Sequence, residues 1–303
     1  MIDDAGRRTR DGVVSAVIAY TMWGFLPVYF LFTVAVSPVE MLSHRIIWSV
    51  PFGALIIALR RQWPDVRNAL RVRAKIGWLS LAAIMIALNW LIYIFAVYEG
   101  KIFQASLGYY INPLIYVLVG VVFFNEKLRR LQLVAIVLAF IGVAVLTISG
   151  GDFPWIAISL ALLFTVYGVI RKQVDIGGMP GLFIETLVLL PFALLALTIL
   201  MQQGEAAFGA PNTSTTLTLL ILLSGPVTVL PLLCFALAAR RLPLSMIGFL
   251  QFIGPTLQFL IGYLNGEPLS TPRLICFILI WSAVIVFCAD SVRRYRASRA
   301  STA

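Results

Sequence analysis

The chain has 303 residues, of which 61% are hydrophobic and only 12% are charged, and its mean hydropathy is +0.97. This composition excludes a soluble globular protein and indicates a single membrane domain. The net charge of +10 does not indicate nucleic-acid binding, because nearly all of the 23 basic residues lie in short segments between apolar stretches. The three cysteines lie within apolar stretches without disulfide or zinc-binding spacing, so we expect no metal and no cofactor.

About ten apolar stretches follow one another along the chain, and each is long enough to cross ~30 Å of hydrocarbon as a helix. Basic residues cluster before the first stretch and after every second one. The positive-inside rule therefore predicts a multi-pass protein of the cell (inner) membrane with cytoplasmic N- and C-termini. The basic segments could also contact anionic membrane lipid. We expect transmembrane helices at 12–32, 39–59, 76–98, 103–124, 131–149, 154–171, 181–201, 217–239, 244–264 and 272–290.

Two connecting segments differ in composition from the others. The segment 60–75 is strongly basic and is predicted to hold a short surface helix. The segment 202–216 is rich in small and polar residues without Lys or Arg, which predicts a flexible connector.

The chain also repeats itself. The motif Ile111-Asn112-Pro113 returns as Ile253-Gly254-Pro255, and Pro51-Phe52 returns as Pro191-Phe192. With five spans in each half, the second half must be inverted relative to the first, an architecture typical of transporters with a midplane cavity. The predicted fold is therefore all-α, with ten transmembrane helices in two inverted five-helix repeats, residues 12–149 and 154–290.

Proline residues within the spans allow two interpretations. Each removes one intrahelical hydrogen bond and kinks its helix. The equivalent residues Pro113 and Pro255 are candidate hinges for alternating access, whereas the alternative is that the kinks only shape the bundle.

Arg45 is the most conspicuous charge within a predicted span, and the repeat aligns it with Glu185. One hypothesis is that Arg45 faces the cavity and binds an anionic or carboxylate-bearing substrate. The alternatives are an ion pair with Glu40 or Glu99, or an extended side chain that reaches the membrane surface.

Two further titratable residues are candidates for proton coupling or gating. Glu185 is expected near the cytoplasmic end of its span, too far from Arg45 for a direct ion pair. It could carry a proton, or it could anchor an inner gate through Arg171 or Lys172. His44 is the single histidine, and it could relay protons or simply pack and hydrogen bond.

Polar and aromatic residues share faces of several spans at helical spacing. Amides and phenols facing lipid would lack partners, so these faces are expected to point inward, either as contacts between helices or as the lining of a cavity. The candidate substrate-binding residues besides Arg45 are Trp23, Asn89, Tyr93, Tyr109, Asn112, Tyr116, Gln251 and Gln258.

These features resemble the drug/metabolite transporter superfamily, EamA type, and within it the RarD-like (chloramphenicol-sensitive protein) members. The resemblance rests on Trp23-Gly24, on Arg45 within the stretch 44–49, on Asn89-Trp90, on the run Leu-Gly-Tyr-Tyr-Ile-Asn-Pro-Leu at 107–114 and on the stretch 251–256. It implies two inverted five-helix repeats, a plasma-membrane location and export of a small molecule, but no particular substrate.

The sequence therefore predicts a secondary transporter that exports a small amphipathic metabolite, amino acid or drug by alternating access. A channel-like facilitator is the alternative within the membrane-transport class. An integral-membrane enzyme is disfavoured, because it would need paired carboxylates, a metal cluster or a nucleophile with its base.

Overall fold

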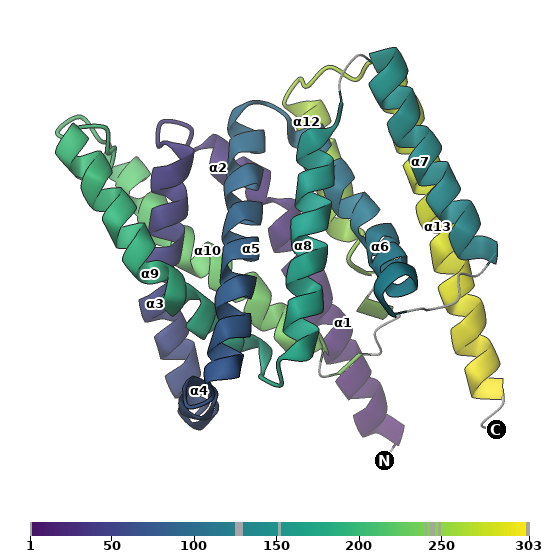
Figure 1. The fold of residues 1–303 in the computed structure, drawn as a ribbon, viewed down its shortest axis with the longest axis horizontal. Helices are drawn as coiled ribbons and strands as arrows, with labels where there is room; N and C mark the ends of the chain where they lie inside the picture. The colour runs from purple at the N-terminus through teal and green to yellow at the C-terminus, as the bar shows by residue number, and fades with distance from the viewer. Residues whose placement is uncertain are drawn as a thin grey trace.

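A computed structural model of the protein describes residues 2–124, 130–150, 153–239, 241–242, 246–247 and 250–300. Every secondary-structure element assigned in these ranges is an α-helix (Figure 1). The elements are α1 (Ile2–Gly24), α2 (Leu26–Leu31), α3 (Pro38–Leu59), α4 (Trp63–Leu70), α5 (Arg73–Tyr98), α6 (Ile102–Phe124), α7 (Arg130–Gly150), α8 (Trp155–Gln173), α9 (Gly178–Gln203), α10 (Thr215–Ala239), α12 (Ile253–Leu264) and α13 (Thr271–Ala300).

The helices are long and apolar, as the composition predicts. Within the described ranges, 7 segments are long and apolar enough to cross a membrane, and Trp155–Arg171 and Ile253–Leu264 are shorter apolar helices. The expectation of an all-helical, multi-pass membrane protein is therefore confirmed. The seven segments are Thr9–Leu31, Pro38–Leu59, Arg73–Tyr98, Arg130–Ser149, Gly178–Gln203, Thr215–Ala239 and Thr271–Ala289.

The first of these segments is not one continuous helix. Helix α1 ends at Gly24 and α2 begins at Leu26, and Pro27 lies in the first turn of α2. Pro27 has no N–H to donate to the carbonyl of Trp23, four residues earlier. The side chain of Gln258 on α12 donates to this carbonyl instead, at 3.1 Å, so another helix satisfies the group that proline leaves free.

The predicted surface helix between the second and third spans is confirmed as α4. It lies at the same end of the bundle as the two chain termini (Figure 1). Its Val66 and Ala69 are each 2% exposed and pack into an apolar cluster with Phe183 of α9, so α4 is held against the bundle.

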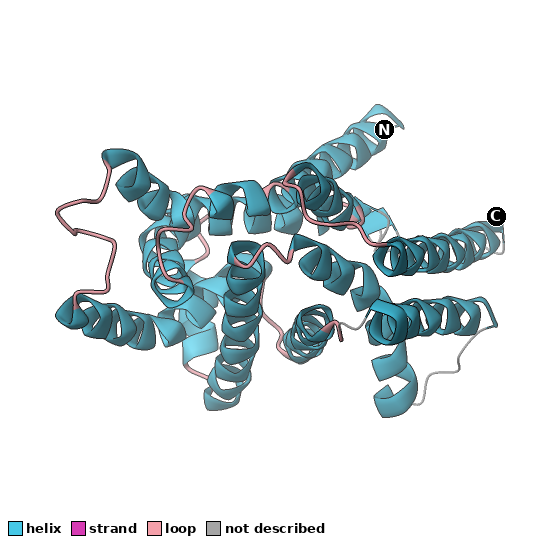
Figure 2. Cartoon of the chain, turned by 90° about the horizontal axis from the view of Figure 1, so that it is seen from above, coloured by secondary structure: helices cyan, strands magenta, loops and turns pink. Residues whose placement is uncertain are grey.

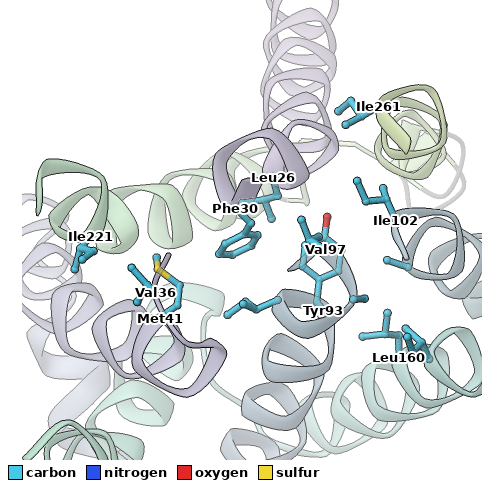
Figure 3. Packing of buried hydrophobic residues seen from close by; sticks show 14 residues of the cluster. Leu26, Phe30, Val36, Met41, Tyr93, Val97, Ile102, Leu160, Ile221 and Ile261 are labelled. Atoms are coloured by element: carbon cyan, nitrogen blue, oxygen red, sulfur yellow. The ribbon is translucent and has the colours of Figure 1, made fainter. Parts of the chain in front are cut away.

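Helices from both halves of the chain share one hydrophobic core. Close packing of large side chains excludes water and stabilises the bundle through dispersion contacts. Figure 3 shows this core, where the ring of Phe30 lies between α3 and α5. Its members include Leu26, Phe30, Val36, Met41, Tyr93, Val97, Ile102, Leu160, Ile221 and Ile261.

Helices α7 and α13 form a pair at one side of the molecule, where they run along each other (Figures 1 and 2). A second cluster of buried side chains, including Ala135, Ala139, Phe277 and Ile280, joins this pair to α6. The pair therefore has its own core rather than projecting alone into lipid.

Glycines let two pairs of helices meet at their backbones. A Cβ atom on Gly225 of α10 would overlap the carbonyl of Trp48 on α3, and one on Gly108 of α6 would lie 2.7 Å from the carbonyl oxygen of Ala157 on α8. Only glycine leaves room for so close an approach.

We expect Gly225→Ala to lower the free energy of unfolding by about 1–3 kcal/mol, because the added methyl group must force α10 away from α3. Gly77→Ala in α5 is the matched control, since a Cβ there meets nothing within 4 Å and alanine favours the helix by up to ~1 kcal/mol. The measurement is thermal unfolding in detergent. Equal midpoints for the two variants would show that the α3–α10 contact tolerates a methyl group.

Candidate functional site

Arg45 lies in the first half of α3 and is only 4% exposed. Its Nε donates a hydrogen bond of 2.7 Å to Oγ1 of Thr228 on α10, and this hydroxyl donates to the carbonyl of Ser224 at 2.8 Å. Its buried Nη1 has no hydrogen-bond partner among the described residues. A desolvated cation with an unused donor is costly to maintain, so this guanidinium is suited to accept an anionic partner.

The alternatives that the sequence left open for Arg45 do not hold in the described part of the chain. Glu40 accepts hydrogen bonds from the α9–α10 loop, and Oε2 of Glu99 lies 4.0 Å from Nζ of Lys101. The burial of Arg45 also excludes a side chain that extends to the membrane surface. The charge of Arg45 is therefore held inside the bundle without either acid.

Aromatic rings surround the guanidinium of Arg45. Its Cζ lies 4.3 Å from the centre of a ring of Trp90 and 5.7 Å from that of Phe30, which allows cation–π attraction. Tyr93 packs against Phe30 at 6.0 Å and against Tyr109 at 5.8 Å. The hydroxyl of Tyr93 is also buried without a hydrogen-bond partner among the described residues, so a second polar atom here is available to a ligand.

Asn89 completes this group of contacts. Its Nδ2 donates to the carbonyl of Leu160 on α8 at 3.0 Å, and its Oδ1 accepts a hydrogen bond from the hydroxyl of Tyr109 at 3.4 Å. Four of the predicted residues thus lie in one network, together with two aromatic neighbours. We call this set the Arg45 cluster: Phe30, Arg45, Asn89, Trp90, Tyr93 and Tyr109.

Other predicted residues make contacts outside the Arg45 cluster. Asn112 accepts a hydrogen bond of 2.8 Å from Thr165 of α8, and Gln258 binds the backbone of Trp23. The ring of Trp23 packs against Tyr20 and Phe235. These contacts favour the interpretation of Asn112 and Gln258 as links between helices.

Four of the remaining candidates lie on α6 or near the start of α12. Pro113 is inside α6, whereas Pro255 is in the first turn of α12, where a missing N–H disrupts no helical bond. The equivalence of these two prolines in sequence therefore does not extend to their positions in the helices. Gln251 is a half-buried turn residue just before α12. The side chain of Tyr116 lies outside the described residues.

Glu185 is fully buried on α9 and meets two side chains of α8. The hydroxyl of Tyr167 donates to its Oε2 at 3.2 Å, and Nη1 of Arg171 lies 3.4 Å from its Oε1. The predicted anchor to Arg171 is therefore present, and the side chain of Lys172 lies outside the described residues. Arg171 is in the last turn of α8, and the α8–α9 link lies at the end of the bundle where the termini lie (Figure 1).

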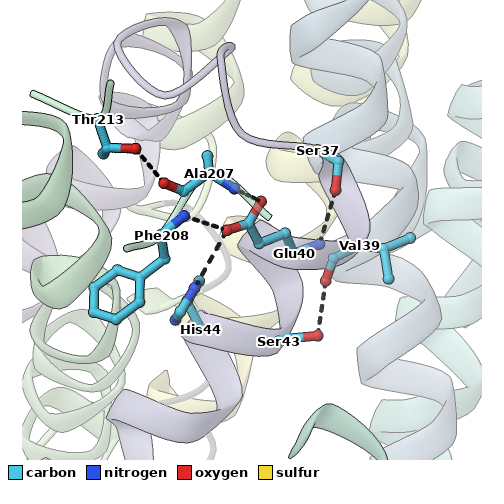
Figure 4. Close-up of polar contacts among 8 residues, drawn as sticks. All are labelled: Ser37, Val39, Glu40, Ser43, His44, Ala207, Phe208 and Thr213. Carbon is cyan, nitrogen blue, oxygen red and sulfur yellow. Dashed lines mark hydrogen bonds and ion pairs between the residues drawn. The ribbon is translucent and has the colours of Figure 1, made fainter. Parts of the chain in front are cut away.

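At the opposite end, the carboxylate of Glu40 binds the loop between α9 and α10 (Figure 4). It accepts hydrogen bonds from the backbone N–H groups of Ala207 at 2.9 Å and Phe208 at 2.8 Å. Nε2 of His44 lies 3.6 Å from Glu40, and its ring packs on Phe208 at 4.8 Å. His44 thus supports Glu40 and the loop.

Sequence reasoning missed the role of Glu40, and its description of the segment 202–216 as a flexible connector did not indicate that Glu40 binds this loop. Backbone donors leave no trace in a sequence of small and polar residues. The available signal was the spacing Ser37-x-x-Glu40, which is typical of a helix N-terminus. Ser37 does accept a hydrogen bond from the N–H of Glu40 at 3.2 Å, but the carboxylate reaches out to the loop.

The described residues contain no group of three His, Cys, Asp or Glu side chains that could hold a metal ion.

We expect Glu40→Ala to release the α9–α10 loop, because it removes two charge-assisted hydrogen bonds worth roughly 1.5–3 kcal/mol each. Limited proteolysis of the protein in detergent should show cleavage in the loop at a rate more than roughly tenfold higher. Glu205→Ala is the matched control, since Glu205 is an exposed acid of the same loop. Loop cleavage at the wild-type rate in both variants would contradict the anchoring role of Glu40.

Removing the partner of Glu185 should be strongly destabilising. Arg171→Met leaves the buried carboxylate without its cation, a change that typically costs ~3–5 kcal/mol. Adding Glu185→Gln should restore most of the lost thermal stability, because a neutral amide needs no counter-charge. Arg241→Met is the control for loss of a basic side chain, since Arg241 Nη1 donates to a carbonyl of α10 at 3.2 Å. Additive effects of the two substitutions would contradict the ion pair.

The helices and their buried polar contacts define a multi-pass α-helical membrane protein. The model of the EamA-like transporter family matches residues 10–148. An uncharacterized transporter of Vibrio cholerae is 43% identical over 96% of each chain. The protein RarD of Escherichia coli is 39% identical over 96% of this chain and 98% of its own. The chain belongs to the EamA-like transporter family, among relatives of the RarD type.

A further relative agrees with this membership, and a solved structure shares the fold. A Pseudomonas aeruginosa relative named chloramphenicol-sensitive protein RarD is 33% identical over 96% of this chain and 97% of its own. A protein of known crystal structure superimposes with a TM-score of 0.59 over 91% of this chain and 96% of its own, at 18% identity. At that identity the likeness establishes the fold alone.

Proposed function

We propose that the protein is a secondary transporter of the inner (cell) membrane that exports a small amphipathic metabolite, amino acid or drug by alternating access. The family and the names of its relatives support membrane transport rather than enzymatic chemistry. The relative named for chloramphenicol sensitivity supports a drug-like compound as one member of the substrate class.

The proposed architecture has ten transmembrane helices in two inverted repeats, residues 12–149 and 154–290. Helix contacts support it. The counterparts of α1, α3, α5, α6 and α7 in the first half are α8, α9, α10, α12 and α13 in the second half. When each helix is exchanged for its counterpart, the pattern of contacts between helices is reproduced. Thus α5 packs on α8 as α10 packs on α1, and α6 packs on α8 as α12 packs on α1. Similarly, α3 packs on α10 as α9 packs on α5, while α3–α9, α6–α12 and α7–α13 are pairs of counterparts. Sequence repeats and packing thus suggest the same division.

The proposed orientation has both termini in the cytoplasm. Helix α4, which lies within the basic segment 60–75, the α8–α9 link and both termini lie at one end of the bundle (Figure 1). Basic segments gathered at one end are what the positive-inside rule expects of the cytoplasmic side. The Glu185–Arg171 ion pair would then close the inner end, and the Glu40 contacts would close the outer end.

The single observation that carries the proposal is the buried cation of Arg45 with no acid beside it in the described part of the chain. Its Nη1 and the hydroxyl of Tyr93 both lack hydrogen-bond partners there. A substrate carboxylate would satisfy the guanidinium, while the rings of Trp90 and Phe30 would bind an apolar or aromatic body. The Arg45 cluster therefore suits a substrate with an anionic group and an apolar part.

We expect Arg45→Ala to weaken binding of carboxylate-bearing amphipathic compounds by roughly 10- to 100-fold, since a hydrogen bond to a charged group contributes about 1.5–3 kcal/mol. Binding is measured by thermal shift of the purified protein against a panel of amino acids, amphipathic acids and chloramphenicol, followed by uptake into proteoliposomes.

Two controls make this test specific. Arg67→Ala removes an exposed arginine of α4, outside the Arg45 cluster, and should leave binding unchanged. Chloramphenicol carries no carboxylate, so its binding should depend less on Arg45. If acids and chloramphenicol bind equally well to wild type and Arg45→Ala, Arg45 is structural and the proposed recognition of an anionic group is wrong.

A further inference from the structure

Glu267 is a buried acid outside the predicted spans, in the loop that joins α12 to α13. It is 9% exposed, and its Oε2 accepts a hydrogen bond of 2.9 Å from the backbone N–H of Phe103 in the first turn of α6. The backbone N–H of Ile102 also donates to it. A side chain from one half of the chain thus caps a helix of the other half.

The surroundings of Glu267 combine a helix terminus with an apolar wall. Phe103 stacks on Phe259 of α12 at 5.0 Å and meets Phe277 of α13 at 5.7 Å. Gly262 of α12 lies directly beneath the carboxylate, since a Cβ there would be 3.2 Å from Oε2 and 3.0 Å from the ring of Phe103. The carboxyl group is therefore shielded from water by α6, α12 and α13 together.

Few charges face this carboxyl group. From α13, Nη1 of Arg273 lies 4.0 Å from Oε1, and Arg273 also donates to the carbonyl of Pro268 at 2.7 Å. At the link into α6, Lys101 pairs with Glu99 at 4.0 Å. The contacts from α12 come from Gly262, which does not titrate. Burial raises the pKa of Glu267 to about 7, although Arg273 and the two N–H groups act in the opposite direction.

Helices α12 and α6 are joined at further points along the same interface. The hydroxyl of Ser106 donates to the carbonyl of Pro255 at 2.8 Å, and the hydroxyls of Tyr110 and Thr256 are 2.7 Å apart. The α6–α12 contact joins the two halves of the chain, so a change at Glu267 acts on the relative position of those halves.

We propose that Glu267 is a proton-binding site that controls the closure of the α12–α13 loop over the N-terminus of α6. When the loop is closed, the carboxyl group is buried and prefers to hold its proton. When the loop opens, the group is solvated and loses the proton at a lower pH. Proton binding therefore favours the closed arrangement, and proton release favours the open one.

The size of this effect follows from the two pKa values. With about 7 for the closed state and 4.5 for a solvated carboxyl group, the equilibrium constant for opening should rise about tenfold between pH 6 and pH 8. The rise should level off above pH 8, where both states are ionised. Because this concerns the protein without substrate, it is independent of the proposed transport function.

Hydrogen–deuterium exchange of the full-length protein in nanodiscs tests the proposal. After correction for the intrinsic pH dependence of exchange, peptides covering residues 102–106 should exchange about tenfold faster at pH 8 than at pH 6. Glu267→Gln should show slow exchange at both pH values, because a neutral amide resembles the protonated acid. Glu99→Gln is the matched control, an exposed acid near the same helix end, and should behave as the wild type.

A second variant keeps the proposal testable if the Glu267→Gln protein fails to fold. Arg273→Gln keeps the carboxyl group and removes the cation that lowers its pKa, so the pH midpoint of the exchange change should move upward. The proposal is overturned if wild type and Glu267→Gln have the same pH profile, or if Arg273→Gln leaves the midpoint unchanged or lowers it.

Discussion

A charged side chain inside an apolar helical bundle must meet a partner from another helix or loop, and this requirement decides which parts of the protein stay together. Glu185 holds α9 to α8 through Arg171. Glu40 holds the start of α3 to the α9–α10 loop. Each contact joins segments that lipid alone would not draw together, since hydrocarbon chains are as apolar as the helix surfaces.

Arg45 differs from these acids in what it meets. Its contacts are a hydroxyl and aromatic faces, which orient the guanidinium without neutralising it. The acids thus link neighbouring segments at the two ends of the bundle, whereas the cation in the Arg45 cluster retains the capacity to bind an anion. A substrate site between two closed ends of the bundle requires paired acids at the ends and a cation without an acid between them. This is why the proposed function centres on Arg45.

The sequence predicted the helical membrane fold and α4, and it indicated the contact of Glu185 with Arg171 as one alternative, because each follows from hydropathy or charge. The prolines within the spans predicted kinks, but not that Gln258 of α12 satisfies the carbonyl that Pro27 leaves free, since a freed carbonyl does not indicate which helix will satisfy it. Nor did the sequence indicate that Glu40 binds the backbone of a distant loop. Contacts to backbone groups depend on the tertiary arrangement, which the identity of a single residue and its neighbours in sequence does not reveal.

The backbone contact between Gly225 and Trp48 has a mechanical consequence. Helices α3 and α10 meet there without an intervening layer of side chains, so the joint can neither be compressed nor repacked as side-chain contacts can. Helices α3 and α10 therefore behave as one rigid unit. Any rotation that carries Arg45 would also carry Thr228, so the guanidinium would keep its hydrogen bond to α10.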